Sequence, residues 1–323
     1  MNPPKPASQH PKVRPILTLL ALLIVYFFWG GTYLGIRLAV RTIPAFLMAG
    51  TRFLVAGTAV YAYARLRGAQ RPTRDHWLSA GLVGVLLLVG GNGLVSWAEQ
   101  LVPSGIAALL VATVPLWMIL LGLLDRRNPR PSLVVFGGVL LGFIGVGVLV
   151  LPSGSGPDRV SPLGVAALLA GAVFWAWGSL RSRTAKLPAS PLLANGMQMI
   201  VGGALLVLAG LGSGEGSRLH FASISMESLL GLGYLISFGS IVAYNAYIWL
   251  LKHADPTWVS TYAFVNPIVA VFLGWLIAHE RFAPRALLAT AIIVLAVVII
   301  TVTKNLEAGA VRRRARTAGG DAA

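Results

Sequence analysis

The stretch ILTLLALLIVYFFWGGTYLGI, residues 16–36, decides the fold class of this chain. A helix needs about 20 mostly apolar residues to cross the hydrocarbon core of a bilayer, and this stretch carries no charge over that length. Lys12 and Arg14 precede it, but it is too long for the apolar core of a signal peptide and ends without an A-x-A-like cleavage site. We therefore predict a transmembrane helix that is retained in the mature protein.

Further apolar runs follow along the 323 residues, with only short segments between them. The predicted spans are 16–37, 44–65, 77–98, 102–124 and 132–151, then 161–181, 190–212, 228–250, 257–278 and 284–303. Hydrophobic residues make up 56% of the chain and charged residues 11%, which excludes a disordered chain and a soluble two-domain enzyme. We predict an all-α integral membrane protein with ten transmembrane helices.

The formal net charge of +16 would suit a nucleic-acid partner, but the positions of the basic residues argue against one. Most of the 26 Lys and Arg residues lie in alternate short loops and at the two ends, as the positive-inside rule describes for cytoplasmic segments. We expect a multi-pass protein of a bacterial inner membrane, with both termini cytoplasmic and no nucleic-acid partner. The chain has no cysteine, which excludes a thiolate metal site, and we expect neither a metal nor a cofactor.

Six features recur in the same order in the two halves of the chain, at an offset of about 146 to 153 residues. The pairs are Phe28-Trp29 with Phe174-Trp175, Pro44 with Pro191, Asn92 with Asn245, residues 102–104 with 255–257, Pro115 with Pro267, and Gly122 with Gly274. Because each repeat holds an odd number of helices, the second begins on the opposite side of the membrane. The repeats are therefore predicted to be inverted copies, a recurring plan among transporters.

This organisation predicts four segments. They are a cytoplasmic tail at 1–15, a first repeat at 16–151, a second repeat at 161–303 and a basic cytoplasmic tail at 304–323. Both tails are expected to lack regular structure, because the first is rich in proline and polar residues and the second carries a run of arginines. Since one chain supplies both halves, a functional monomer is expected and a dimer stays open.

Several short motifs resemble the EamA family of the drug/metabolite transporter superfamily, and within it the YedA-type exporters. They are residues 29–33 (WGGTY), 52–53 (RF), 103–109 (PSGIAAL), 112–115 (ATVP), 238–240 (FGS) and 262–267 (YAFVNP). The resemblance covers nearly the whole chain and implies ten helices, two inverted five-helix repeats and export of small metabolites or drugs. Many members carry a Glu at the end of both fourth helices of the repeats. Glu280 matches it in the second half, whereas the first half has Arg126-Arg127-Asn128, so a role that needs two symmetric carboxylates is in doubt.

Polar side chains inside the predicted spans mark candidate site residues, because a charge at the centre of a membrane helix costs about 2.5–3.5 kcal/mol. The candidates for a substrate-binding cavity are Trp29, Tyr33, Asn92, Ser96, Trp175, Tyr244, Asn245, Tyr262 and Asn266. Those of the first half recur at helical spacing on one face of their helices. The alternative interpretation is that the Trp and Tyr residues form interfacial aromatic belts and the Asn residues hold helices together.

Four further residues are candidates for moving parts. Arg37 and Glu99 are predicted to form a gate or ion pair at the outer end of the cavity, with a snorkelling pair without function as the alternative. Pro115 and Pro267 are predicted hinges, because each removes a hydrogen bond from its helix, with a purely structural kink as the alternative. Arg52, several residues inside its span, is either a substrate or gating cation or a side chain that fixes packing.

The chain lacks a GxxxxGK[ST] loop, so ATP is not expected to drive it. The carboxylates are predicted to lie near helix ends, which weakens proton coupling and leaves facilitated efflux equally compatible. We predict a secondary transporter that exports small metabolites, such as amino acids, or drugs by alternating access. The alternatives are a membrane-embedded enzyme and a membrane sensor or scaffold. Scattered histidines and the absence of DDxxD and HExxH motifs argue against an enzyme.

Overall fold

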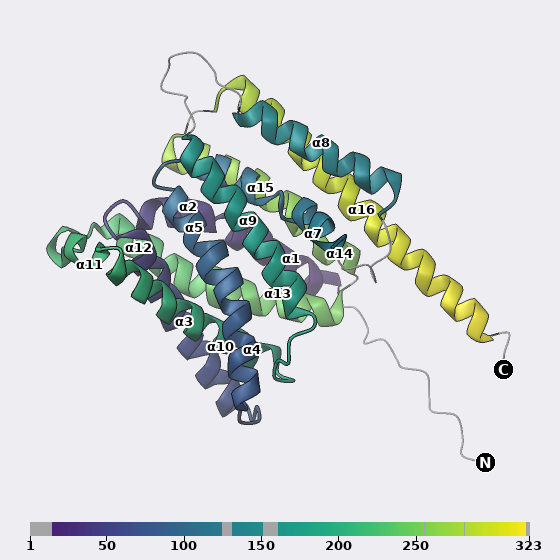
Figure 1. Ribbon diagram of the computed structural model, residues 1–323, viewed down its shortest axis with the longest axis horizontal. Coiled ribbons are helices and arrows are strands. Elements are labelled where there is room, and N and C mark those ends of the chain that lie inside the picture. Colours follow the sequence, from purple (N-terminus) through teal and green to yellow (C-terminus); the bar gives the residue numbers. More distant parts are fainter. Residues whose placement is uncertain (1–14, 125–130, 151–160, 255, 281, 321–323) are drawn as a thin grey trace.

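The computed structural model describes residues 15–124, 131–150, 161–254, 256–280 and 282–320, and these ranges contain helices and no β-strand (Figure 1). Nine of the described helices are long and apolar enough to cross a membrane. They are Pro15–Ala39, Ala45–Leu66, Arg74–Ala98, Ser104–Gly122, Pro162–Ser182, Pro191–Gly212, Met226–Tyr247, Trp258–Ala278 and Pro284–Glu307. The predicted all-α membrane class is therefore confirmed, and each of the nine corresponds to a predicted span.

The first half of the chain contains eight α-helices and one π-helix among the described residues. They are α1 (Pro15–Gly30), α2 (Thr32–Ala39), α3 (Ala45–Leu66), α4 (Arg74–Gly84), the π-helix η1 (Val85–Gly93), α5 (Leu94–Ala98), α6 (Ser104–Val111), α7 (Val114–Gly122) and α8 (Leu133–Val150). The predicted fifth span, 132–151, coincides with α8. Its apolar stretch Leu133–Leu149 is shorter than each of the nine helices above. The described residues therefore contain nine helices long enough to cross a membrane, and the tenth predicted span is not confirmed.

The second half follows a similar order. Its elements are α9 (Pro162–Ser182), α10 (Pro191–Gly212), α11 (Glu215–Arg218), the 3-10 helix η2 (Phe221–Ser223), α12 (Met226–Tyr234), the π-helix η3 (Leu235–Val242), α13 (Ala243–His253), α14 (Pro256–Ser260), α15 (Tyr262–Ala278) and α16 (Pro284–Gly320). The prediction that 304–323 lacks regular structure is wrong for the described part, because α16 continues to Gly320. Alanine and arginine are strong helix formers, and they are frequent in this segment.

Serine side chains fix where three helices of the second half begin. Ser161, Ser190 and Ser225 each accept a hydrogen bond from the backbone N–H three residues further on. Pro162 and Pro191 then occupy the first helical position, where a missing N–H does no harm. These caps satisfy amide groups that would otherwise be unpaired at the membrane surface.

Glycines bring α3 and α10 into backbone contact. A Cβ on Gly203 would lie 2.8 Å from the Leu54 nitrogen and 3.0 Å from the Gly50 oxygen. One heptad away, a Cβ on Gly57 would lie 3.1 Å from the Gly196 oxygen. Small residues at this spacing allow helices to pack closely in a bilayer, where van der Waals contact drives association.

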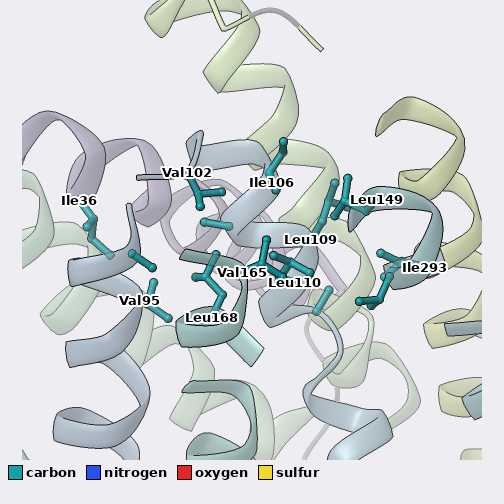
Figure 2. Close-up of a cluster of buried hydrophobic side chains, with 14 of the residues drawn as sticks. Ile36, Val95, Val102, Ile106, Leu109, Leu110, Leu149, Val165, Leu168 and Ile293 are labelled. Carbon is teal, nitrogen blue, oxygen red and sulfur yellow. The ribbon is translucent and has the colours of Figure 1, made fainter. Parts of the chain in front are cut away.

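The helices α8 and α16 lie side by side along one edge of the bundle (Figure 1). Gly138 faces Ile300 and Gly145 faces Ile293, whereas Gly142 faces Leu116 of α7. The three glycines thus allow α8 to approach two different helices closely. Figure 2 shows part of the buried core beside this edge, where apolar side chains of α2, α5, α6, α8, α9 and α16 meet, among them Leu109, Leu110 and Leu168.

Several of the spans are interrupted by helix breaks or by π-helices. The helix break at Gly31 separates α1 from α2, and α6 ends before Ala112 and Thr113. Two other spans pass through the π-helices η1 and η3. Such segments inside membrane helices are frequent at functional sites, because they free backbone groups and re-aim side chains.

Candidate functional site

Three aromatic side chains from helices far apart in the sequence form a cluster between the halves of the chain. The ring centre of Trp29, on α1, lies 5.1 Å from that of Tyr247 on α13 and 5.4 Å from that of Tyr262 on α15. The two tyrosine rings are 5.6 Å apart and nearly perpendicular. Edge-to-face geometry of this kind is the preferred arrangement of aromatic rings. We call these three residues the aromatic cluster.

The aromatic cluster is anchored to the π-helix η3. The indole N–H of Trp29 donates to the Gly239 carbonyl over 3.0 Å. A carbonyl of this π-helix thus accepts a hydrogen bond from another helix of the bundle. A Cβ at Gly239 would lie 2.9 Å from the Thr32 methyl group and 3.3 Å from a terminal nitrogen of Arg52, so both side chains pack closely against this turn.

Arg52 joins α3 to the same π-helix. Its Nε donates to the Ser240 hydroxyl over 2.9 Å, and its guanidinium carbon lies 4.8 Å from the centre of the Phe53 ring. The residue is only 6% exposed. A guanidinium has five N–H donors, and this hydrogen bond uses one of them. The side chain is thus placed to hold an additional acceptor beside the aromatic cluster.

Asn266 of α15 lies where α15 passes close to α1. A Cβ on Gly30 would come within 3.1 Å of the Asn266 carbonyl, so the two backbones nearly touch. The side-chain oxygen of Asn266 is buried and has no hydrogen-bond partner in the described structure. Among the predicted cavity residues, the structure therefore brings Trp29, Tyr262 and Asn266 to one region.

Trp175 lies in a different interface, that of α9 with η1. A Cβ on Gly91 would be 2.9 Å from the Trp175 ring, and one on Gly90 would be 2.6 Å from Phe174. Asn92 follows Gly91 in the π-helix and is half-buried. Trp175 and Asn92 thus lie near each other but outside the aromatic cluster.

Tyr244 and Asn245 lie at the start of α13, just after η3. The Asn245 amide donates to the Ile241 carbonyl over 2.8 Å, so it binds its own helix rather than a facing one. Tyr244 is half-buried and precedes Tyr247 by one helical turn. The sequence analysis missed Tyr247, although a tyrosine three residues after Tyr244 on one helical face was a signal that could have found it.

Arg37 and Glu99 do meet, but through the backbone. A guanidinium N–H of Arg37 donates to the main-chain carbonyl of Glu99. Both carboxylate oxygens of Glu99 and the hydroxyl of Ser96, one turn earlier, are buried without a hydrogen-bond partner in the described structure. Tyr33, a further predicted cavity residue, is close enough to Glu99 to interact electrostatically.

Glu99 follows the last residue of its span and is 0% exposed. Burial raises the pKa of its carboxyl well above the ordinary value, and the nearby Glu280 carboxylate raises the pKa too, whereas Arg37 and Arg52 lower it. The position at a helix C-terminus adds to the cost of a negative charge. The carboxyl is therefore held in an environment that favours its neutral form.

Two glutamates of the second half bind helix N-termini of the first half. The Glu280 carboxylate accepts from the Ser104 N–H at 2.8 Å, the Ser104 hydroxyl at 2.9 Å and the Gly105 N–H at 3.2 Å. The Glu215 carboxylate accepts from the N–H groups of Phe46 and Leu47. Carboxylates are favourable at helix N-termini because they face unpaired N–H groups and the positive end of the helix dipole.

Glu99, Glu215, Glu227 and Glu280 all lie at one end of the bundle, where α2 and α5 end and α3 and α6 begin. We call this the acidic end. The basic residues around α3, α4 and α9, among them Arg65, Arg67, Arg71, Arg74, Arg181, Arg183 and Lys186, lie at the opposite end. The sequence predicted carboxylates near helix ends, but not that Glu215, Glu227 and Glu280 would bind groups of the first half of the chain.

The two predicted hinge prolines occupy different positions. Pro267 lies inside α15, where it removes a helix hydrogen bond. Pro115 lies in the first turn of α7, directly after the break at Ala112 and Thr113, so it begins a helix rather than bending one. The sequence could not distinguish the two, because both lie within long apolar runs.

The described residues contain no group of three His, Cys, Asp or Glu side chains that could hold a metal ion. The site is thus built from aromatic rings, one buried guanidinium, amides and one buried carboxyl. Such a set can bind a small solute and a proton.

Comparison with known proteins places this architecture among transporters. A model of the EamA-like transporter family matches the chain twice, over residues 16–151 and 162–302. The "Uncharacterized inner membrane transporter YedA" of Escherichia coli (strain K12) is 40% identical over 297 residues, which cover 91% of this chain and 94% of YedA. The "Uncharacterized transporter YvbV" of Bacillus subtilis (strain 168) is 25% identical and covers 94% of this chain and 97% of YvbV.

A solved crystal structure of a protein shows the same fold. It is 21% identical to this chain, and the alignment covers 89% of this chain and 97% of the other with a TM-score of 0.59.

Proposed function

The chain belongs to the EamA-like transporter family, which confirms the resemblance in its sequence, and we propose that it is a secondary transporter that exports small solutes by alternating access. The proposed location is the bacterial inner membrane, as the name of its relative YedA states for that protein. The basic end is proposed to face the cytoplasm, with both termini, because lysine and arginine concentrate there.

The proposed architecture is two inverted five-helix repeats, with α8 as the tenth spanning helix. The family model matches the chain twice in succession, which supports a duplication. The π-helices begin at Val85 and Leu235, an offset of about 150 residues that agrees with the offset in the sequence. Each π-helix also receives a tryptophan from the other half, since Trp29 binds η3 and Trp175 packs on η1.

The observation that carries the function is the aromatic cluster between the halves, with Arg52 beside it. If the two halves exchanged conformations, the site would become accessible from the opposite end of the bundle. Alternating access requires such a change. Rings from both halves would stack on a flat or apolar part of a solute, and the guanidinium would bind an anionic or polar group. Amino acids and similar metabolites combine these features.

The experiment that tests this proposal is solute flux in proteoliposomes of the purified protein. Labelled amino acids, nucleosides and cationic dyes would be screened with and without a pH gradient. Trp29→Ala is expected to lower the flux of the transported solute at least about tenfold, because it removes both ring contacts and the bond to η3.

Trp177 provides a matched control for this substitution. It lies on α9 with 49% of its surface exposed, so Trp177→Ala removes the same side chain away from the cluster and is expected to keep flux near wild type. Equal loss in both variants would contradict a binding role for Trp29. Absence of flux for every class with folded protein would shift weight to an untested solute first, and then to a sensor or enzyme.

A further inference from the structure

We propose that the Glu99 carboxyl is a proton-binding site, and that a proton held there favours the form of the transporter that is closed at the acidic end. This inference rests on the proposed alternating access. It extends that function by naming an ion and by assigning it to one residue.

The burial of Glu99 is the first argument. The residue is 0% exposed, and neither carboxylate oxygen has a hydrogen-bond partner in the described structure. The hydroxyl of Ser96, on the same helical face, is likewise buried and unpartnered. A buried ion without hydrogen bonds is so costly that the group takes up a proton instead.

The cationic groups near Glu99 donate to atoms other than its carboxylate oxygens. Arg37 on α2 donates to the Glu99 main chain, and Arg52 on α3 donates to Ser240. Glu280, after α15, binds the N-terminus of α6 and adds a negative charge nearby. Its remaining titratable neighbour is Tyr33 on α2.

The other elements packed against α5 offer no charge to Glu99. The π-helix η1 has no titratable side chain, and Arg181 of α9 lies at the far end of that helix. The part of α9 nearest to this end is apolar, since Gly164 packs against Val102. The carboxyl therefore has no counter-ion in contact among the described residues.

The acidic end is closed in this structure by contacts between the two halves. Glu280 and Glu215 bind the N-termini of α6 and α3, and Arg41 pairs with Glu227 at 2.7 Å. The Ser228 hydroxyl also donates to the Leu38 carbonyl over 2.8 Å. Opening this end requires these contacts to part, and water then reaches Glu99 and allows it to ionise.

The sign of the linkage follows from this difference. The closed form binds the proton more tightly than the open form, so protonation favours closure at low pH. Closure weakens as pH rises through the range in which the closed form releases its proton. For one proton, the ratio of closed to open forms changes by at most about tenfold per pH unit.

The absence of cysteine from the chain makes accessibility a clean test. Val102→Cys would place a thiol at a 0% exposed position beside Glu99, between α5 and α6. Its rate of labelling by a membrane-impermeant maleimide would be divided by that of Ala222→Cys, an exposed position in η2. This ratio removes the intrinsic pH dependence of the thiol reaction.

The ratio is expected to rise at least about tenfold between about pH 5 and about pH 9. Glu99→Gln, which is neutral at every pH, should give a low ratio without this rise. Asp75→Asn removes an exposed carboxylate away from the acidic end and should keep the rise, as should Glu99→Asp, which keeps a carboxyl.

A flat ratio in otherwise wild-type protein overturns the proposal without any Glu99 variant. A rise that persists in Glu99→Gln overturns it as well, because another group would then be titrating. Labelling needs no solute, so a missing flux leaves this test intact. Solute transport together with a labelling ratio that does not change with pH would contradict the proton site and leave the proposed transport function standing.

Discussion

At the scale of single residues, Arg52 shows how a charge is kept inside a membrane bundle. Its guanidinium is buried, lies over the Phe53 ring and donates to Ser240 in η3. Buried charges that are hydrogen-bonded in this way hold helices in register, and an arginine does so with a rigid fork of donors. Of the two roles predicted for Arg52, the structure therefore displays the packing contact directly.

Substitution of Arg52 should destabilise the protein mainly by removing its hydrogen bond to Ser240. Arg52→Gln is expected to lower the unfolding free energy in detergent by about 1.5–3 kcal/mol, the usual value of a hydrogen bond to a charged group. Ser240→Ala should give a smaller loss, and the double variant should lose no more than Arg52→Gln alone. Thermal unfolding measures all three, and additive losses would contradict a shared bond.

The sequence predicted some of these residues but not their partners. Helical spacing indicated that Trp29, Tyr33 and Arg37 share a face, yet spacing within one helix carries no information about which distant helix it meets. The Trp29 contacts with Tyr247 and Gly239 therefore had to come from the structure. The binding of helix ends by Glu280 and Glu215 was hidden for the same reason.

At the scale of elements, the close contact of α3 with α10 depends on glycine. The groups that face Gly203 are backbone atoms, at 2.8 Å from Leu54 and 3.0 Å from Gly50, and backbone cannot move aside as a side chain can. Any side chain at this position must push the two helices apart.

Gly203→Ala is accordingly expected to destabilise the protein by about 1–3 kcal/mol, the usual cost of overpacking. Gly212→Ala is the matched control, because it lies at the end of the same helix with open space around it, and it should leave the melting temperature unchanged. The melting temperatures of both variants in detergent check this. Equal values would contradict a tight contact.

Nine spans could be predicted to within a few residues because apolar length alone identifies a membrane helix. The breaks inside them could not. The π-helices and the ends of α1 and α6 lie within uniformly apolar runs, where no change of pattern marks a change of hydrogen bonding. The continuation of α16 was missed because its charged composition resembled a disordered tail.

At the scale of the whole molecule, charge separates the two ends of the bundle. Arginines and lysines gather around the end of α3, the start of α4 and the end of α9, whereas at the acidic end Arg41 and Arg218 lie among glutamates of which two are buried. On the positive-inside rule, we propose that the basic end faces the cytoplasm and the acidic end the outside.

Cysteine labelling of intact cells tests this orientation. Ala222→Cys, at the acidic end, is expected to react with an impermeant maleimide added outside, because the residue is exposed in η2. Gln70→Cys, exposed between α3 and α4 at the basic end, should react only after the cells are permeabilised. The reverse pattern would place the termini outside.

The carboxylates on the N-termini of α3 and α6 also have a kinetic consequence. In the proposed alternating access, each opening of the acidic end would break the bonds of Glu215 and Glu280 to these two helix ends, and a hydrogen bond to a charged group contributes about 1.5–3 kcal/mol. Loss of one such bond in the transition state would slow the opening by roughly ten- to more than a hundredfold, so we expect this step to limit the cycle. The maximal rate of transport would then depend on how often the acidic end opens. Solutes with very different affinities would therefore be exported at similar maximal rates.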